Sequence, residues 1–141
     1  MSLTDKLLQL DSKKVMEKPV EMVEMKRFSD MAGEKIEFKC VALDGDTHSD
    51  IQKRGVDLGK KGNIRDIHMF TVKVHTLLEG VKEPSFKDPK LREQYGAATP
   101  TELVSKILLP GEIDELYKRI SILSGFEADD EDDEPEDEVK N

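Results

Sequence analysis

Histidine is the residue type in this chain best suited to bind a metal, and the spacing of the three histidines does not predict a metal site. His68 and His75 are seven residues apart. On a helix they share one face but lie about 10 Å apart, at about 1.5 Å per residue, which is too far for one ion. His48 stands alone in a turn, and no zinc-binding pattern is present. We therefore expect histidines that pack or face the solvent, and no metal.

Three aspartates suggest a calcium loop, but the spacing of the residues that follow them is wrong. Asp44, Asp46 and Asp50 are close in sequence. An EF-hand needs glycine at position 6 and glutamate at position 12. Counted from Asp44, those positions hold Ser49 and Gly55. The segment is therefore expected to be a turn that caps a helix.

The segment Gly55–Gly62 contains glycine and lysine, the residue types that hold phosphate in the Walker motif. Their positions do not match that motif. That motif has a second glycine five residues after the first, followed by Lys and then Ser or Thr. Lys60 occupies the place of the second glycine, and Gly62 follows Lys61. We expect a flexible basic loop and no bound cofactor.

The sulfur-containing residues give no catalytic site. Cys40 is the single cysteine, so no internal disulfide is possible and a cytosolic setting is the simplest interpretation. It alternates with charged residues at an inward strand position, which favours a buried and inert thiol. A group of methionines, Met22, Met25 and Met31, suits either the core or an adaptable binding surface. Nothing selects a general acid and base among the carboxylates, so we expect no enzymatic activity.

The negative charge of the chain is concentrated at its end. The 141 residues carry a formal net charge of −9, and residues 127–141 contain ten carboxylates and one lysine, so residues 1–126 are neutral overall. We expect residues 127–141 to form a disordered acidic tail, which favours solubility or binds a basic partner. A neutral body gives no basic patch for nucleic acid. With 38% charged residues and no run of about 18 apolar residues, no membrane span or secretory signal is expected.

Apolar spacing predicts an α+β fold. Residues 4–14 suit a helix, and Pro19 prevents any continuation of that helix. Residues 20–28 and 34–43 suit two strands of a hairpin, joined by a turn over Ser29–Gly33. Asp46 or Thr47 then caps a short helix that runs through Arg54. The segment 64–80 has both helical and alternating spacing, and its length favours a helix.

The C-terminal third has the clearest helix boundaries. Asp88-Pro89 and Thr99-Pro100 are caps followed by proline at the first helical position, and Glu102 can accept a hydrogen bond from the amide of Thr99. A last helix carries apolar residues at helical spacing over 113–123 and ends at Gly125. We therefore expect one domain over residues 1–126, with an N-terminal helix and a β-hairpin packed on a helical C-terminal part, about five helices in all.

Several short motifs in order resemble those of phage tail assembly chaperones of the XkdN-like group, which occur in tailed phages and prophage elements of Gram-positive bacteria. Upstream, Lys26-Arg27-Phe28 and Ile36-Glu37-Phe38 fit the group loosely. The motifs of the C-terminal third are Glu83-Pro84, Phe86-Lys87-Asp88-Pro89-Lys90-Leu91, Tyr95-Gly96, Thr99-Pro100-Thr101-Glu102-Leu103-Val104, Lys106-Ile107-Leu108-Leu109, Gly111-Glu112-Ile113 and Leu123-Ser124-Gly125-Phe126.

This resemblance implies a non-enzymatic role in the cytoplasm of a bacterial host. The partner that it implies is the tape measure protein, a long helical chain kept soluble until the tail tube assembles around it. A longer product of ribosomal frameshifting would recruit the tail tube protein. It implies no cofactor, no nucleic acid and no membrane, and it leaves open whether the chain forms a homo-oligomer.

A chaperone of this kind needs an apolar groove for an amphipathic helix. Leu109 lies at a helix break, and Ile122 lies off the main apolar stripe of the last helix. Together with Phe126, which follows Gly125, these residues are candidates to border the groove. They could equally close the core or mediate self-association. An alternative function is an acidic regulator that binds a basic partner through residues 127–141, with steep salt dependence.

Overall fold

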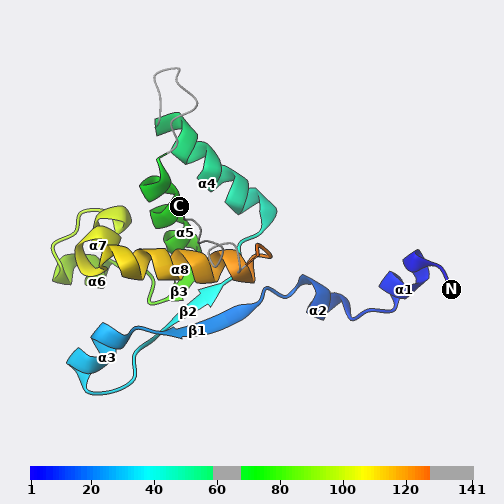
Figure 1. Cartoon of the computed structure of the whole chain (residues 1–141), viewed down its shortest axis with the longest axis horizontal. Coiled ribbons are helices and arrows are strands. Elements are labelled where there is room, and N and C mark those ends of the chain that lie inside the picture. The colour runs from blue at the N-terminus through cyan, green and yellow to red at the C-terminus, as the bar shows by residue number, and fades with distance from the viewer. Residues whose placement is uncertain (59–67, 128–141) are drawn as a thin grey trace, which may run out of the picture.

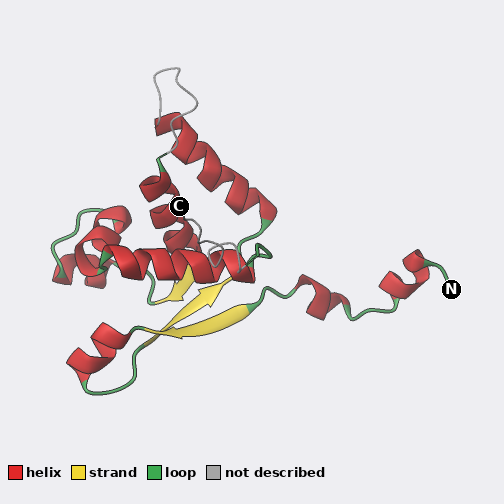
Figure 2. Ribbon diagram, viewed as in Figure 1, coloured by secondary structure: helices red, strands yellow, loops and turns green. Residues whose placement is uncertain are grey.

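A three-stranded antiparallel sheet forms one layer of the fold, and helices cover one of its faces (Figures 1 and 2). The computed structural model describes residues 1–58 and 68–127. The strands are β1 (Val20–Glu24), β2 (Glu37–Val41) and β3 (Val81–Glu83), with β2 in the middle. Together with the helices this confirms the expected α+β class.

The register of the sheet decides which side chains enter the core. Val23 lies opposite Phe38 in the β1–β2 pair, and both are buried. Cys40, two residues after Phe38, points to the same face and is completely buried, as the alternation predicted. The other face carries Val20 and Met22, which are half exposed. That face is therefore open at these two positions of β1, although Val41, opposite Val20, is buried.

Eight helices accompany the sheet in the parts of the chain that the structure describes. Helices α5 and α8 pack on each other and on the strands, while α4 and α7 pack on α5 and α6 packs on α7. Their bounds are α1 (Leu3–Leu8), α2 (Ser12–Met16), α3 (Lys26–Ala32), α4 (Gly45–Leu58), α5 (Met69–Gly80), α6 (Pro89–Gln94), α7 (Pro100–Ile107) and α8 (Pro110–Leu123).

The helix boundaries predicted in the C-terminal third are confirmed, with one change. The Asp88 side chain caps α6, and Thr99 Oγ1 accepts a hydrogen bond from Glu102 N at 3.1 Å. The Glu102 carboxylate accepts instead from Ala98 N at 2.9 Å, one residue before the expected amide. Helices α6 and α7 therefore start where a side-chain oxygen accepts from a free N–H group, whereas the N-cap of α8, Leu109, makes no side-chain hydrogen bond.

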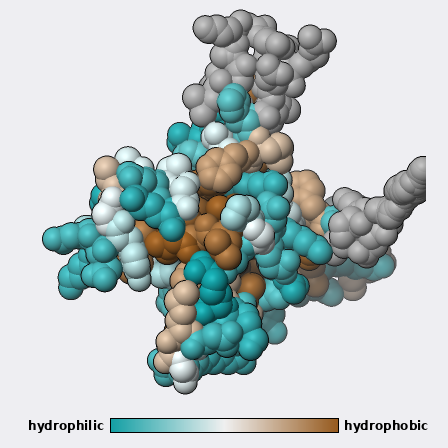
Figure 3. Space-filling view, turned by 60° about the vertical axis from the view of Figure 1, so that its left-hand side comes forward, coloured by the Kyte–Doolittle hydropathy of each residue, from teal (hydrophilic) through white to brown (hydrophobic). Residues whose placement is uncertain are grey.

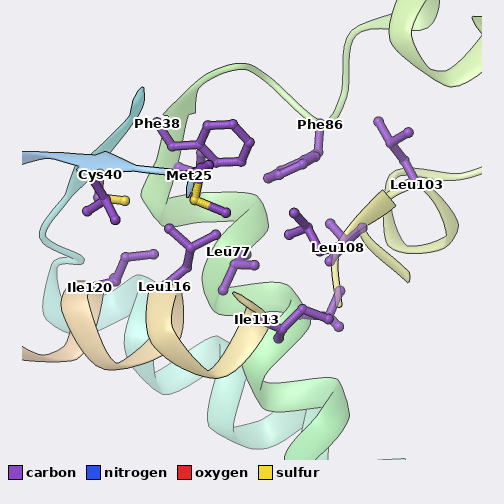
Figure 4. Packing of buried hydrophobic residues seen from close by; sticks show 14 of the residues in the cluster. Met25, Phe38, Cys40, Leu77, Phe86, Leu103, Leu108, Ile113, Leu116 and Ile120 are labelled. Carbon is purple, nitrogen blue, oxygen red and sulfur yellow. The ribbon is translucent and has the colours of Figure 1, made fainter. Parts of the chain in front are cut away.

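A single core joins the sheet to the helices. Figure 4 shows Phe38 and Phe86 above Leu77 of α5 and Leu116 of α8. Phe86, Leu77 and Leu116 are almost completely buried. At the end of α5, Gly80 lies directly against Ile120 of α8. The close contact between α5 and α8 therefore depends on a residue without a side chain.

The N-terminal helix is not continuous. Instead of one helix over residues 4–14, the chain forms α1 and α2, which are separated at Asp11. The Asp11 side chain accepts a hydrogen bond from Lys13 N and caps α2. Neither helix has a buried residue. Asp11 is a better N-cap than a helix interior residue, and no packed neighbour imposes continuity.

The hairpin prediction was right about the strand pairing and wrong about the connection. Strand β1 ends at Glu24, and α3 occupies the place of the expected strand end and turn. Gly33 ends α3 with a φ of 74°, the left-handed conformation that glycine adopts freely. Strand β3 was not predicted, because three residues are too few to show a period.

The helix after Asp44 is longer than predicted and has a different cap. Asp44 Oδ1 accepts a hydrogen bond from Thr47 N at 2.8 Å, so Asp44 caps α4, not Asp46 or Thr47. Helix α4 continues past Arg54 to Leu58. The helix predicted over 64–80 is confirmed from Met69 onward. The basic loop predicted over Gly55–Gly62 is therefore wrong for residues 55–58, which continue α4. Its remainder at 59–62, the start of the next helix at 64–67 and the acidic tail from 128 lie outside the described residues.

Candidate functional site

An open apolar groove lies between α3 and β2 on one side and α6 and α7 on the other. Its volume is about 670 Å³. In Figure 3, apolar surface gathers in the middle of the face that carries these helices, with hydrophilic surface around it. We call this feature the α3 groove. It is lined by Arg27, Phe28, Met31, Ala32, Ile36, Phe38, Pro84, Leu91, Tyr95, Lys106 and Ile107.

Helix α3 builds the first wall of the groove. Its position depends on Ser29, which is buried and whose Oγ accepts a hydrogen bond from Ile36 N at 2.8 Å. This bond ties the helix to the start of β2. Phe28 and Met31 of α3 line the groove, and Met31 is 69% exposed. A methionine this exposed at the edge of an apolar groove is well suited to adapt to a partner.

Helices α6 and α7 build the second wall. Leu91 and Tyr95 of α6 and Ile107 of α7 line this part of the groove. Gly96 ends α6 with a φ of 65°, and Arg92 Nη1 donates a hydrogen bond to Ala98 O at 3.2 Å, which ties α6 to the start of α7. Tyr95 is half exposed, so its ring is available to an occupant while its hydroxyl stays near water.

The floor of the groove is part of the hydrophobic core. The Phe28 and Phe38 rings stack with centroids 6.1 Å apart. Phe38 meets Phe86 edge-on, also at 6.1 Å. Aromatic pairs at these distances stabilise each other beyond the area that they bury. The floor is therefore preformed, and the exposed side chains at the rim are the adjustable part.

An ion pair fixes α3 to the start of α8. Arg27 Nε and Nη2 donate to the two carboxylate oxygens of Glu112, each at 2.8 Å. Arg27 Nη2 also donates to Ile107 O at 2.8 Å, and Glu112 accepts from Leu109 N. The hydrogen bonds from Arg27 hold the pKa of Glu112 below its ordinary value. This two-pronged geometry is the strong form of the arginine–carboxylate pair.

A second, smaller hollow lies on the other side of Arg27. Its volume is about 460 Å³, and Leu109 contributes to its lining. Four carboxylates line it, against two cations, Lys26 and Arg27, whereas the charged residues that line the α3 groove are both cationic. The two hollows therefore have opposite electrostatic character.

The structure separates the three residues predicted to border a groove. Leu109 is half exposed and precedes α8, whereas Phe126 is half exposed and follows it. Helix α8 has 14 residues and is about 21 Å long, so these two side chains lie far apart. Ile122 is only partly buried. The assignment of these three residues to partner contact stays a prediction.

The residues considered for chemistry do not form a catalytic site in the described parts of the chain. His48 packs on Phe126 with ring centroids 5.1 Å apart. His75 lines a small polar hollow, where burial lowers its pKa. Burial also raises the pKa of Cys40 to about 11, so its reactive thiolate is disfavoured. Within residues 1–58 and 68–127, no group of three or more His, Cys, Asp or Glu residues could hold a metal.

The sequence prediction missed the α3 groove because its walls are far apart in the chain. Of the residues that line this groove, only Met31 was considered for binding, within a group of methionines that the structure divides. Met25 is buried in the core, and Met22 lies on the open face of the sheet. The signal that could have found the groove is the placement of an apolar methionine, Met31, within a connection that was expected to be a turn. In the described ranges, no helix is long and apolar enough to cross a membrane.

Comparisons with known proteins agree with this fold. Residues 4–140 match the family described as phage XkdN-like tail assembly chaperone protein, TAC. The phage-like element PBSX protein XkdN of Bacillus subtilis (strain 168) is 28% identical over 120 residues, which is 82% of this chain and 80% of that protein. A crystal structure of the protein YqbN has a similar fold, with a TM-score of 0.63 at 22% identity, over 79% of this chain and 89% of that one. The match over nearly the whole chain shows that this protein belongs to the family of XkdN-like phage tail assembly chaperones.

Proposed function

We propose that this chaperone binds amphipathic helices of the tape measure protein in the α3 groove and keeps that protein soluble until the tail tube forms. The observation that carries the proposal is an open groove whose walls are apolar and whose rim includes exposed Met31 and Tyr95. An amphipathic helix places an apolar stripe into a groove of this kind. The role is non-enzymatic and belongs to the cytoplasm of the bacterial host.

The lining of the groove favours a polypeptide over a small polar ligand. Sites for small ligands combine apolar walls with several convergent polar groups. Here the charged groups are Arg27 and Lys106, and Arg27 already holds Glu112. Lys106 is 4.0 Å from Glu102 and about half exposed. An occupant with an apolar stripe flanked by carboxylates would fit these groups, with Lys106 at the rim.

Leu109 extends this surface to the far side of Arg27. A helix longer than the groove could pass over Arg27 and contact Leu109 as well. Ile122 and Phe126 would then belong to a separate contact, such as that of a longer frameshift product with the tail tube protein. In this proposal all three candidate residues contact partners, but at two separate sites, because α8 separates Leu109 from Phe126.

Co-expression with the tape measure protein tests the proposal. The wild-type chaperone should increase the soluble fraction of the tape measure protein and co-purify with it. Met31→Asp and Tyr95→Asp should abolish both effects, because a carboxylate in the apolar groove loses its hydration. Both residues are exposed, so the fold should survive, which circular dichroism can check.

Met22→Asp provides a matched control. Met22 is also an exposed methionine, but it lies on the open face of the sheet, opposite Lys39. This variant should solubilise the tape measure protein as well as the wild type does. If wild-type chaperone has no effect on solubility, the proposed function is wrong. If Met31→Asp and Met22→Asp behave alike, the function stands but the groove is not its site.

A further inference from the structure

The outer edge of β1 is not paired with another strand. The strands lie in the order β1-β2-β3, so β1 has one neighbour, and Figure 2 shows it at the margin of the sheet. Folded proteins normally protect such an edge with lysine, proline, a β-bulge or an inward-pointing charge. Strand β1 contains no lysine or proline and pairs with β2 without a register shift. Its inward charge, Glu21, already has a partner in Arg119 of α8 at 3.4 Å.

The hydrogen-bond pattern shows which backbone groups of β1 face this edge. Met25 N donates to Ile36 O at 2.9 Å, and Ala42 N donates to Pro19 O at 3.1 Å. In an antiparallel pair, residues that bond to the partner alternate with residues whose N–H and C=O groups point away from it. Because residues 19 and 25 bond to β2, the even-numbered residues between them point outward. Among the described residues, no hydrogen bond uses their N–H groups.

The side chains of these even-numbered residues form a short row on the open side of β1. Val20 and Met22 are half exposed. Glu24 lies directly opposite Glu37, and like charges that face each other across two strands destabilise a sheet. Glu37 lies 3.5 Å from Lys35, whereas Glu24 has no ion pair in the described parts of the chain. The row therefore has two apolar positions and one position that lacks a cation.

The smaller hollow beside Arg27 lies next to the same strand, on its inner side. Val23 contributes to the lining together with Met25 and Leu109. Side chains of a strand alternate between the two faces, so an added strand would direct every second side chain toward this hollow. The two cations of the lining are already paired with carboxylates of the same lining. The hollow therefore accepts a further side chain without repelling a basic partner.

These features favour a segment of another protein over a second copy of β1. Two copies of β1 paired antiparallel about Met22 would place each Glu24 opposite Val20, and neither glutamate would gain a cation. The residues 127–141, with ten carboxylates, would be repelled by Glu24. A strand with a lysine or arginine opposite Glu24 and apolar residues opposite Met22 and Val20 would satisfy all three positions.

We propose that β1 binds an extended, basic and apolar segment of a second protein as a fourth strand of the sheet. Main-chain hydrogen bonds supply the affinity, and the alternate side chains supply the specificity. When the segment runs antiparallel to β1, its pattern is lysine or arginine, any residue, apolar, any residue, apolar. No residue of β1 lines the α3 groove, so this proposal does not rest on the function proposed above. The chaperone then holds a helix at one surface and an extended segment at another.

Peptide binding to the isotope-labelled full chain, followed by amide chemical shifts, tests the proposal. The probe is acetyl-Thr-Lys-Thr-Val-Thr-Val-Thr-amide, which has the proposed pattern and residues that favour strands. N-methyl groups on its lysine and both valines remove the N–H groups that would face β1. The matched control carries N-methyl groups on the three threonines that follow those residues, whose N–H groups would face the solvent.

The expected result is a shift of the amides at the edge of β1. The unmodified peptide at up to about 1 mM should shift the amides of Val20, Met22 and Glu24. Methylation of the groups that face β1 should weaken binding about tenfold or more, because three hydrogen bonds are lost. Methylation of the control positions should leave binding within about threefold of the unmodified peptide.

The variant Glu24→Lys tests the charge. It should bind the lysine peptide several-fold more weakly than the wild type and should prefer a peptide with glutamate in place of lysine. Glu24 is exposed, and its replacement also removes the repulsion with Glu37, so the fold should survive. A purely structural effect of the substitution would weaken both peptides alike.

Four results would overturn the proposal. The first is no amide shift at about 1 mM peptide. The second is equal binding of the two methylated peptides, which would show that main-chain hydrogen bonds to β1 are not used. The third is a set of shifts centred on Met31 and Tyr95, which would place the peptide in the α3 groove. The fourth is a shift of the β1 amides on dilution of the chain alone, which would show that a second copy covers the edge.

Discussion

Replacement of Gly80 by alanine should destabilise the fold by overfilling the contact between α5 and α8. A Cβ atom at this position would lie 2.6 Å from Ile120 Cδ1, 2.8 Å from Cγ2 and 3.0 Å from Cγ1. Ile120 is completely buried, so it has no free space to move into. The helices must separate or Ile120 must leave its preferred rotamer.

Two opposing effects set the size of the change. Alanine in place of glycine favours a helix by up to about 1 kcal/mol. Overpacking of a well-filled core costs about 1–3 kcal/mol, and three close contacts with a branched side chain place Gly80→Ala at the upper end. We expect a net loss of about 2 kcal/mol and a fall in Tm of about 5–10 °C.

Urea denaturation followed by circular dichroism measures this loss. Gly80→Ala should lower the midpoint without changing the slope. Gly111→Ala is the matched control, because a Cβ there meets nothing within 4 Å and the same gain in helix propensity applies. That variant should be neutral or slightly more stable than the wild type.

A double-mutant cycle assigns the loss to Ile120. Ile120→Val removes Cδ1, the closest atom, and should cost about 1 kcal/mol alone. In that background Gly80→Ala should become less harmful, with a coupling of about 1 kcal/mol. A Gly80→Ala protein as stable as the wild type, or a loss that Ile120→Val does not change, would refute this explanation.

Three further predictions concern the thiol, the ion pair and the tail. Cys40 should resist iodoacetamide at pH 8 in the folded protein and react after unfolding, because burial raises its pKa to about 11; rapid native labelling, measured by mass spectrometry, would contradict this. The lowered pKa of Glu112 contributes stability above the ordinary glutamate pKa of about 4.3, which is lost as the pH falls through the lower folded value. The wild type should therefore exceed Glu112→Gln in urea midpoint at pH 7 and lose that advantage below about pH 4; a constant difference would show that the charge is not responsible. Deletion of residues 128–141 should leave tape measure binding intact and tolerant of salt in a pull-down, whereas the alternative regulator would lose its partner.

Local signals were predicted well from the sequence because they act within a few residues. The caps at Asp88 and Thr99 and the stop at Gly96 depend on the neighbouring backbone alone, and all three are present. The inward position of Cys40 followed from strict alternation in its strand. Such features survive folding because no tertiary contact competes with them.

The elements that were missed depend on distant contacts or are too short to show a pattern. Helix α3 replaces an expected turn, and it is held by the contacts of Ser29 with Ile36 and of Arg27 with Glu112. The break of the N-terminal helix at Asp11 has the opposite cause. There the local preference of aspartate for a cap decides the structure, because no packing contact overrides it. The α3 groove combines residues from two segments, 27–38 and 84–107, that are far apart in the chain, and no spacing rule within one segment could reveal it.

The ion pair between Arg27 and Glu112 also has a consequence for the timing of synthesis. Its two residues are 85 positions apart, and the second groove wall, on α6 and α7, is made just before Glu112. During translation α3 therefore emerges long before the arginine–carboxylate pair that fixes it to α8 can form. We expect that a partly synthesised chain cannot yet accept a client helix, and that this competence arises only after the first turn of α8 has been synthesised.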